Sequence, residues 1–132
     1  MSQSSFQTPF HELGGVETIK RLVEAFYTKV IQDPDLSPLF PEGIEEIKNK
    51  QTLFLTQFLG GPTAYSDIYG PPAMRARHLR FEVTPQRAKA WLNCMEAAME
   101  EINIESNLRE TIFIRLTQVA FQMVNSPDTN KR

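Results

Sequence analysis

Apolar side chains recur at three- and four-residue spacing along four stretches of the chain, and this period is typical of helices with one buried face. The four predicted helices span residues 16–32, 44–59, 85–103 and 107–124. A short helix precedes them, because Thr8 can cap a helix in which Pro9 takes the first position and Gly14 follows the end. No stretch alternates in the way a strand does. The pattern therefore predicts an all-α fold.

Proline and glycine mark the ends of these helices. Residues 34–41 contain three prolines, so we expect a tight corner that turns Leu39 and Phe40 inward. Residues 60–84 begin with Gly-Gly-Pro and show no period, so we expect a long loop without regular structure. Asn107, with Glu110 three residues later, is typical of a capping box and predicts the start of the last helix.

Composition limits the kind of protein. The 132 residues, 41% of them hydrophobic, suffice for one domain over residues 1–132, with flexible ends at 1–8 and 126–132. A net charge of −2 argues against a nucleic-acid surface, and no apolar run is long enough to span a membrane. The N-terminus lacks the features of a signal peptide, and the single Cys94 excludes an internal disulfide. We therefore expect a cytoplasmic protein in which Cys94 is a buried thiol.

His78 is the centre of the most unusual segment, because Arg75, Arg77 and Arg80 lie within three residues of it. Two interpretations are open. The histidine is either an ordinary surface residue, or it is the metal ligand of a large, flat, anionic cofactor whose carboxylates meet the arginines. Zinc would require more ligands than two distant histidines and one cysteine supply. A nucleophile elbow and a glycine-rich phosphate loop are also missing from the sequence.

A haem site requires one axial histidine, an apolar slot and a few polar groups on the far side of the iron, and the sequence has candidates for each. His78 is the candidate ligand. Tyr27, Gln51 and Trp91 are isolated polar groups on or beside apolar helix faces, and each is also a plausible core residue. Without a Cys-x-x-Cys-His motif, haem would be held non-covalently. The candidate walls of the slot are Phe40, Ile47, Phe54, Leu55 and Phe81.

Gln51 stands out because it occupies the centre of the apolar stripe of its helix. An unpaired buried amide costs about 1–3 kcal/mol. Either a polar group lies across from Gln51, or the helix is rotated so that the amide lies near solvent.

Several short segments together resemble the truncated haemoglobins, specifically group II. The resemblance extends from about Phe10 to Pro127, so it covers nearly the whole chain. It rests on Phe26-Tyr27, Phe40-Pro41, residues 54–57 with 60–62, Arg75-Ala76-Arg77-His78, residues 91–95 and Val124-Asn125.

This resemblance implies a two-over-two helical sandwich around one non-covalent protohaem (haem b). His78 is then the proximal iron ligand, Tyr27 the distal tyrosine, and Trp91 the tryptophan that marks group II. Gln51 falls at a position that varies between apolar residues and glutamine, and Ile47 falls where other globins often carry a distal histidine. Lys50 and Arg77 match positions that usually meet the haem propionates, with Arg75 and Arg80 as alternatives.

The function implied is reversible binding of dioxygen and other diatomic gases, with high affinity and slow release. Two alternatives stay open. The first is redox chemistry, such as nitric oxide dioxygenation or peroxide turnover, which would require an external reductase because the chain holds no reductase domain. The second is a haem-based sensing or interaction module. We expect a monomer or a weak homodimer.

Overall fold

The computed structural model describes residues 8–40, 43–72 and 82–127, and every regular element in these ranges is a helix. The predicted all-α class is therefore confirmed for the described residues. None of these helices is long and apolar enough to cross a lipid bilayer. The elements are α1 (Pro9–Leu13), α2 (Val16–Val30), η2 (Ser37–Leu39), α3 (Ile44–Phe58), α4 (Ala64–Tyr69), α6 (Pro85–Glu101) and α7 (Ser106–Gln122).

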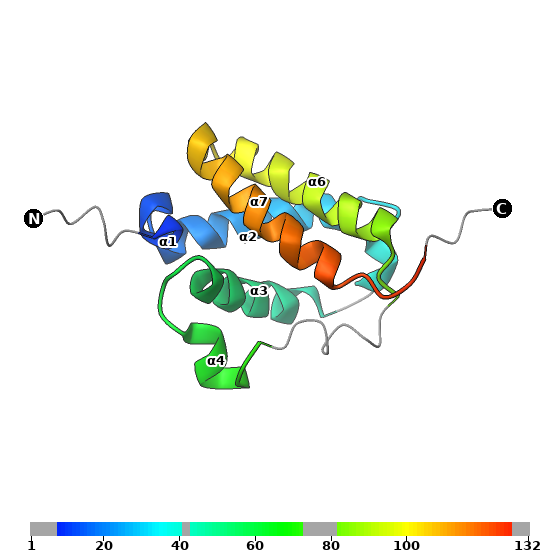
Figure 1. Cartoon of the computed structure of the whole chain (residues 1–132), viewed down its shortest axis with the longest axis horizontal. Helices are drawn as coiled ribbons and strands as arrows, with labels where there is room; N and C mark the ends of the chain where they lie inside the picture. The colour runs from blue at the N-terminus through cyan, green and yellow to red at the C-terminus, as the bar shows by residue number, and fades with distance from the viewer. Residues whose placement is uncertain (1–7, 41–42, 73–81, 128–132) are drawn as a thin grey trace, which may run out of the picture.

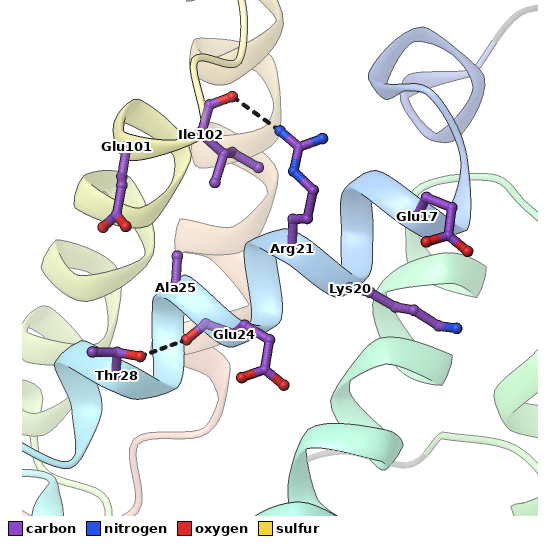
Figure 2. A pocket seen from close by; sticks show the side chains of 8 residues that line it. All are labelled: Glu17, Lys20, Arg21, Glu24, Ala25, Thr28, Glu101 and Ile102. Atoms are coloured by element: carbon purple, nitrogen blue, oxygen red, sulfur yellow. Dashed lines mark hydrogen bonds between the residues drawn. The ribbon is translucent and has the colours of Figure 1, made fainter.

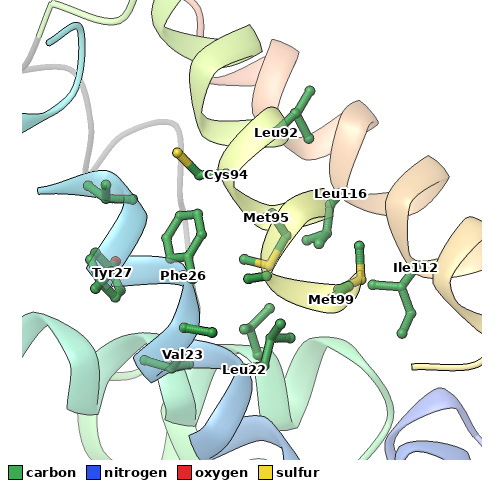
Figure 3. Packing of buried hydrophobic residues seen from close by; sticks show 14 of the residues in the cluster. Leu22, Val23, Phe26, Tyr27, Leu92, Cys94, Met95, Met99, Ile112 and Leu116 are labelled. Atoms are coloured by element: carbon green, nitrogen blue, oxygen red, sulfur yellow. The ribbon is translucent and has the colours of Figure 1, made fainter. Parts of the chain in front are cut away.

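The four long helices pack around one apolar core. α2 packs against both α3 and α6, and α6 packs against α7. Figure 1 shows α6 and α7 side by side above α3, with α2 behind α7 and α4 below α3. The largest fully buried side chains come from all four long helices and include Phe26, Leu55, Met95 and Ile112. Figure 3 shows how the side chains of α2, α6 and α7 converge in this cluster.

Two helices begin at threonine caps, and the cap at Thr8 is the predicted one. The hydroxyl of Thr8 accepts a hydrogen bond from the His11 N–H at 3.4 Å, and the hydroxyl of Thr84 accepts one from the Arg87 N–H at 3.1 Å. The predicted cap at Asn107 is wrong, because α7 begins earlier. The carboxylate of Glu105 accepts hydrogen bonds from the first N–H groups of α7 and is the actual cap. A carboxylate is favoured there because it meets the positive end of the helix dipole.

The loop predicted over residues 60–84 is partly wrong, because residues 64–69 form α4. This helix is fixed to α3 by a side-chain amide. Gln57 Nε2 donates to Ser66 Oγ at 2.8 Å, and Gln57 Oε1 accepts from the Ser66 N–H at 2.9 Å. The ring of Tyr65 meets the ring of Phe54 edge to face, with centroids 6.1 Å apart. Packing on α3 therefore stabilises a helix that is too short to show a period of its own.

A close backbone approach joins α1 to the end of α3. The Phe10 N–H donates to the Leu59 carbonyl at 2.8 Å. Gly60 has φ +100°, and a Cβ at that position would lie 2.5 Å from the Cβ of Thr8. Glycine is required there both for its backbone angle and for its lack of a side chain. This contact holds α1 against the end of α3, which carries several of the predicted site residues.

Thr56 is a buried polar side chain whose hydroxyl has no hydrogen-bond partner among the described residues. The residue is only 4% exposed. An unsatisfied buried hydroxyl costs about 1–3 kcal/mol, and valine has nearly the same shape without the hydroxyl. We expect Thr56→Val to raise the free energy of unfolding by about 1 kcal/mol, measured by urea denaturation.

Thr52, one turn earlier, is the matched control. Its Oγ1 donates to the Lys48 carbonyl at 2.9 Å, so Thr52→Val removes a hydrogen bond that is actually made. We expect no gain in stability from this second substitution. Equal effects of the two valines would contradict the assignment of Thr56 as the unsatisfied group.

Candidate functional site

Tyr27 lies on the buried face of α2 and is 3% exposed. Its hydroxyl donates a hydrogen bond to Gln51 Oε1 on α3 at 3.5 Å. Burial raises the pKa of the Tyr27 phenol well above its ordinary value, because the phenolate would lose its hydration. Tyr27 is therefore a neutral phenol and a hydrogen-bond donor.

Gln51 is half-buried on α3, directly across from Tyr27. The structure thus supports the first of the two explanations for this polar residue in an apolar stripe, because a polar group does lie opposite it. The amide oxygen is used by Tyr27, whereas the amide N–H groups have no acceptor among the described residues. Gln51 therefore retains donors for a further ligand.

Trp91 is the third of the predicted polar groups and lies on α6, half-buried. Its indole N–H has no acceptor within the described part of the chain. The indole ring meets the ring of Phe26 edge to face, with centroids 5.1 Å apart. The rings of Phe26 and Tyr27 also meet edge to face, with centroids 4.7 Å apart. Phe26 thus brings Trp91 and Tyr27 into one cluster, although they belong to different helices.

The apolar stripe of α3 divides into two parts. Leu55 and Leu59 are fully buried in the core, whereas Ile47 and Phe54 are only half-buried. Phe40 is also half-buried, and its ring meets the ring of Tyr27 edge to face at 5.8 Å. Large apolar side chains that the protein covers only in part are suited to contact with an apolar group.

Lys50 lies on the exposed side of α3, beside this half-buried stripe. Its Nζ lies 5.2 Å from the centroid of the Tyr69 ring on α4, within the range of a cation–π contact. The ammonium therefore lies at the edge of the apolar face, and its predicted contact with a cofactor carboxylate stays a prediction.

The segment that carries the predicted iron ligand lies outside the described residues. This applies to His78, to Arg77 and its alternatives Arg75 and Arg80, and to Phe81. Their roles remain predictions from the sequence.

A separate hollow of about 440 Å³ lies between α2 and the end of α6. Figure 2 shows its lining, in which Arg21 reaches toward the carbonyl of Ile102, 3.5 Å from its Nη2. An apolar cofactor placed there would remove charges of both signs from water, which is unfavourable. This hollow is therefore a poor site for such a group. The lining residues are Glu17, Lys20, Arg21, Glu24, Ala25, Thr28, Glu101 and Ile102.

Sequence reasoning missed what two aromatic residues do. The sequence offers Phe26 only as the neighbour of Tyr27 in a short motif, yet its ring contacts the rings of both Tyr27 and Trp91. Tyr65 was placed in an irregular loop, yet it packs on Phe54. Thr63 before and Gly70 after the segment, both usual at helix ends, were the available indication of α4. No comparable pattern along the chain marks Phe26.

Three comparisons with known proteins all match this chain to globins. The family model of bacterial-like globins matches residues 8–125. The chain is 44% identical over 128 residues to group 2 truncated hemoglobin YjbI of Bacillus subtilis, covering 97% of this chain and 96% of that one.

Solved structures agree as well. The crystal structure of the group II truncated hemoglobin from Bacillus anthracis has a TM-score of 0.91 and 49% identity, and covers 94% of this chain and 95% of that chain. The truncated oxygen-avid haemoglobin from Bacillus subtilis has a TM-score of 0.86 and 44% identity, and covers 90% of this chain and 100% of that one. These matches confirm the resemblance and the truncated-globin fold that the sequence predicted.

Proposed function

Because the chain belongs to the bacterial-like globin family, we propose that it binds protohaem non-covalently and holds dioxygen reversibly, with high affinity and slow release. The observation that carries this proposal is the cluster of Tyr27, Gln51 and Trp91. Tyr27 is a neutral buried donor, and the N–H groups of the other two have no acceptor among the described residues. A relative from Bacillus subtilis is described as oxygen-avid.

The residues beside this cluster fit a haem. The family implies haem as the cofactor, and the half-buried face of Phe40, Ile47 and Phe54 offers it an apolar wall. When bound, haem supplies an iron with a free coordination position for a small ligand. The protein's part is to hold the group and to place donors near that position. Besides that wall, the proposed holding residues are Phe81 for the macrocycle, Lys50 and Arg77 for the propionates, and His78 for the iron. Leu55 is fully buried in the core and supports this wall from behind.

The three donors favour slow release of a ligand that accepts hydrogen bonds. Trp91 can only donate, and burial keeps Tyr27 protonated, so Tyr27 can donate its O–H and carries no negative charge that would repel a negative acceptor. Gln51 contributes through its amide N–H, and the single O–H of Tyr27 is shared between Gln51 Oε1, 3.5 Å away, and the ligand. A gas that accepts hydrogen bonds strongly is thus held longer than one that does not.

Replacing Gln51 by leucine tests how much its amide contributes to holding the ligand. We expect Gln51→Leu to speed oxygen release by about 2–10-fold, the value of one neutral hydrogen bond. The measurement is stopped-flow release of oxygen from the ferrous protein. Gln57→Leu is the matched control on the same helix, because its amide is used to fix α4. Equally faster oxygen release in both variants would show that Gln51 has no specific role in holding the ligand.

The proposal as a whole is tested by visible absorption of the purified protein with added haem. We expect a strong Soret band that stays with the protein through gel filtration, and a stable oxygenated spectrum of the ferrous form. His78→Ala should lose this stable band and regain it when imidazole is supplied. A protein that retains no haem would contradict the proposed function.

A further inference from the structure

Phe26 lies between the two aromatic donors of the site. It is fully buried, at 0% exposure. Its ring centroid lies 4.7 Å from that of Tyr27, with an interplanar angle of 77°, and 5.1 Å from that of Trp91, with an angle of 68°. Both contacts have the edge-to-face geometry that aromatic pairs prefer. One phenyl ring therefore contacts a donor from α2 and a donor from α6 at the same time.

Packing in the core fixes the orientation of the Phe26 ring. Figure 3 shows its side chain pointing from α2 toward α6, near Cys94 and Met95. Both of these residues are buried, and Met95 is 0% exposed. Because interiors are close-packed, a ring in such a place has few other positions open to it. The orientation of Phe26 is thus set by the core and not by the site.

The described hydrogen bonds restrain the two donors only weakly. The bond from the Tyr27 hydroxyl to Gln51 Oε1 is 3.5 Å long, beyond the usual range. The Trp91 indole N–H has no acceptor among the described residues. Ring contacts therefore determine most of the orientation of the Tyr27 and Trp91 side chains. For Trp91 the described ring contact is Phe26, and Tyr27 has Phe26 and Phe40.

We propose that Phe26 is a positioning residue that couples Tyr27 to Trp91, so that the two donors point at a bound gas together. This inference rests on the proposed function, because it concerns how that site holds its ligand. Phe26 itself touches no ligand. Its replacement by leucine keeps an apolar side chain in the core and removes the ring against which both donors rest.

The first test does not depend on ligand release. Trp91 is the single tryptophan of the chain, so its indole gives one 15N–1H resonance in the haem-loaded, carbon monoxide-bound ferrous protein. We expect one sharp resonance in the parent, and a broadened or split resonance in Phe26→Leu, because an indole without its support takes several orientations. Ile112→Val changes a fully buried residue of α7; it is the control and should leave the resonance sharp. A resonance that stays single and sharp in Phe26→Leu would overturn the proposal, even if it is shifted by the loss of the aromatic ring.

The second test is a double-mutant cycle on oxygen release. We expect Phe26→Leu to speed release at least threefold in the parent, and to have no further effect in a Tyr27→Phe/Trp91→Phe background. The same factor in both backgrounds would overturn the coupling. If Phe26→Leu does not fold, Phe26→Met takes its place, because a flexible thioether fills the same space without a ring.

The two proposals fail in different ways. If parent and variants bind haem and carbon monoxide but do not hold oxygen, the proposed function fails, while the indole resonance of the carbon monoxide form still reports on Phe26. If Tyr27→Phe and Trp91→Phe speed release and Phe26→Leu alters neither release nor resonance, the positioning role fails alone.

Discussion

Trp91→Phe is expected to speed oxygen release by about 10–150-fold. A hydrogen bond to an acceptor with negative charge contributes about 1.5–3 kcal/mol, and each 1.4 kcal/mol is a factor of ten. Phenylalanine keeps a six-membered ring that can rest against Phe26 and removes the five-membered ring with its N–H, which has no acceptor among the described residues. The measurement is stopped-flow displacement of oxygen from the ferrous haem-loaded protein.

Leu92→Val is the control for this substitution. Leu92 is the next residue of α6, is buried in the core and carries no donor. Its shortening perturbs the packing of the same helix, so we expect little change in the release rate. A rate that stays at the parent value in Trp91→Phe would show that the indole does not hold the ligand.

Tyr27→Phe is the second substitution with a large expected effect, again about 10–150-fold faster release. The ring contacts with Phe26 and Phe40 are kept, and the hydroxyl is lost. Gln51 then also loses the donor that occupies its oxygen. Tyr65→Phe makes the same chemical change at a buried tyrosine of α4 and is expected to leave the release rate unchanged. Similar acceleration in both variants would argue against a specific role for Tyr27.

The pH dependence gives an independent check on Tyr27. Burial raises the pKa of its phenol above the ordinary value near 10, so the neutral donor is present at every lower pH and is lost only above it. The contribution of neutral Tyr27 to the free energy of unfolding is likewise fully present below about pH 10, and it is lost as the pH rises through the folded-state pKa. We expect the release rate of the parent to be constant from about pH 6 to pH 10. A rise centred near pH 10 would mean that Tyr27 ionises as an exposed tyrosine does.

The long helices were predictable because their burial follows the 3.6-residue period. The apolar positions of α2 and α3 placed both helices within two residues of their ends. α4 was not predictable in this way, because six residues held by Gln57 and by packing on Phe54 show no period. The predicted start of α7 was wrong, since asparagine is a more usual cap than glutamate and only the fold shows that Glu105 caps the helix.

The candidate site was predictable as a set of residue types but not as an arrangement. The polar position of Gln51 within an apolar stripe indicated either a polar group opposite it or a helix rotated toward solvent, and the structure places the hydroxyl of Tyr27 opposite it. The role of Phe26 depends on a contact between α2 and α6, which lie far apart in the sequence. A fully buried phenylalanine in a helical stripe looks the same whether it only fills the core or also orients a donor.

The measurement that tests the central claim most directly is the oxygen release rate of the parent beside that of a Tyr27→Phe/Gln51→Leu/Trp91→Phe variant. Both proteins are first shown to retain haem and to melt at similar temperatures. The account predicts slow release from the parent and release at least about 100-fold faster from the variant, because each lost donor contributes. Equal rates from two haem-loaded proteins would contradict it.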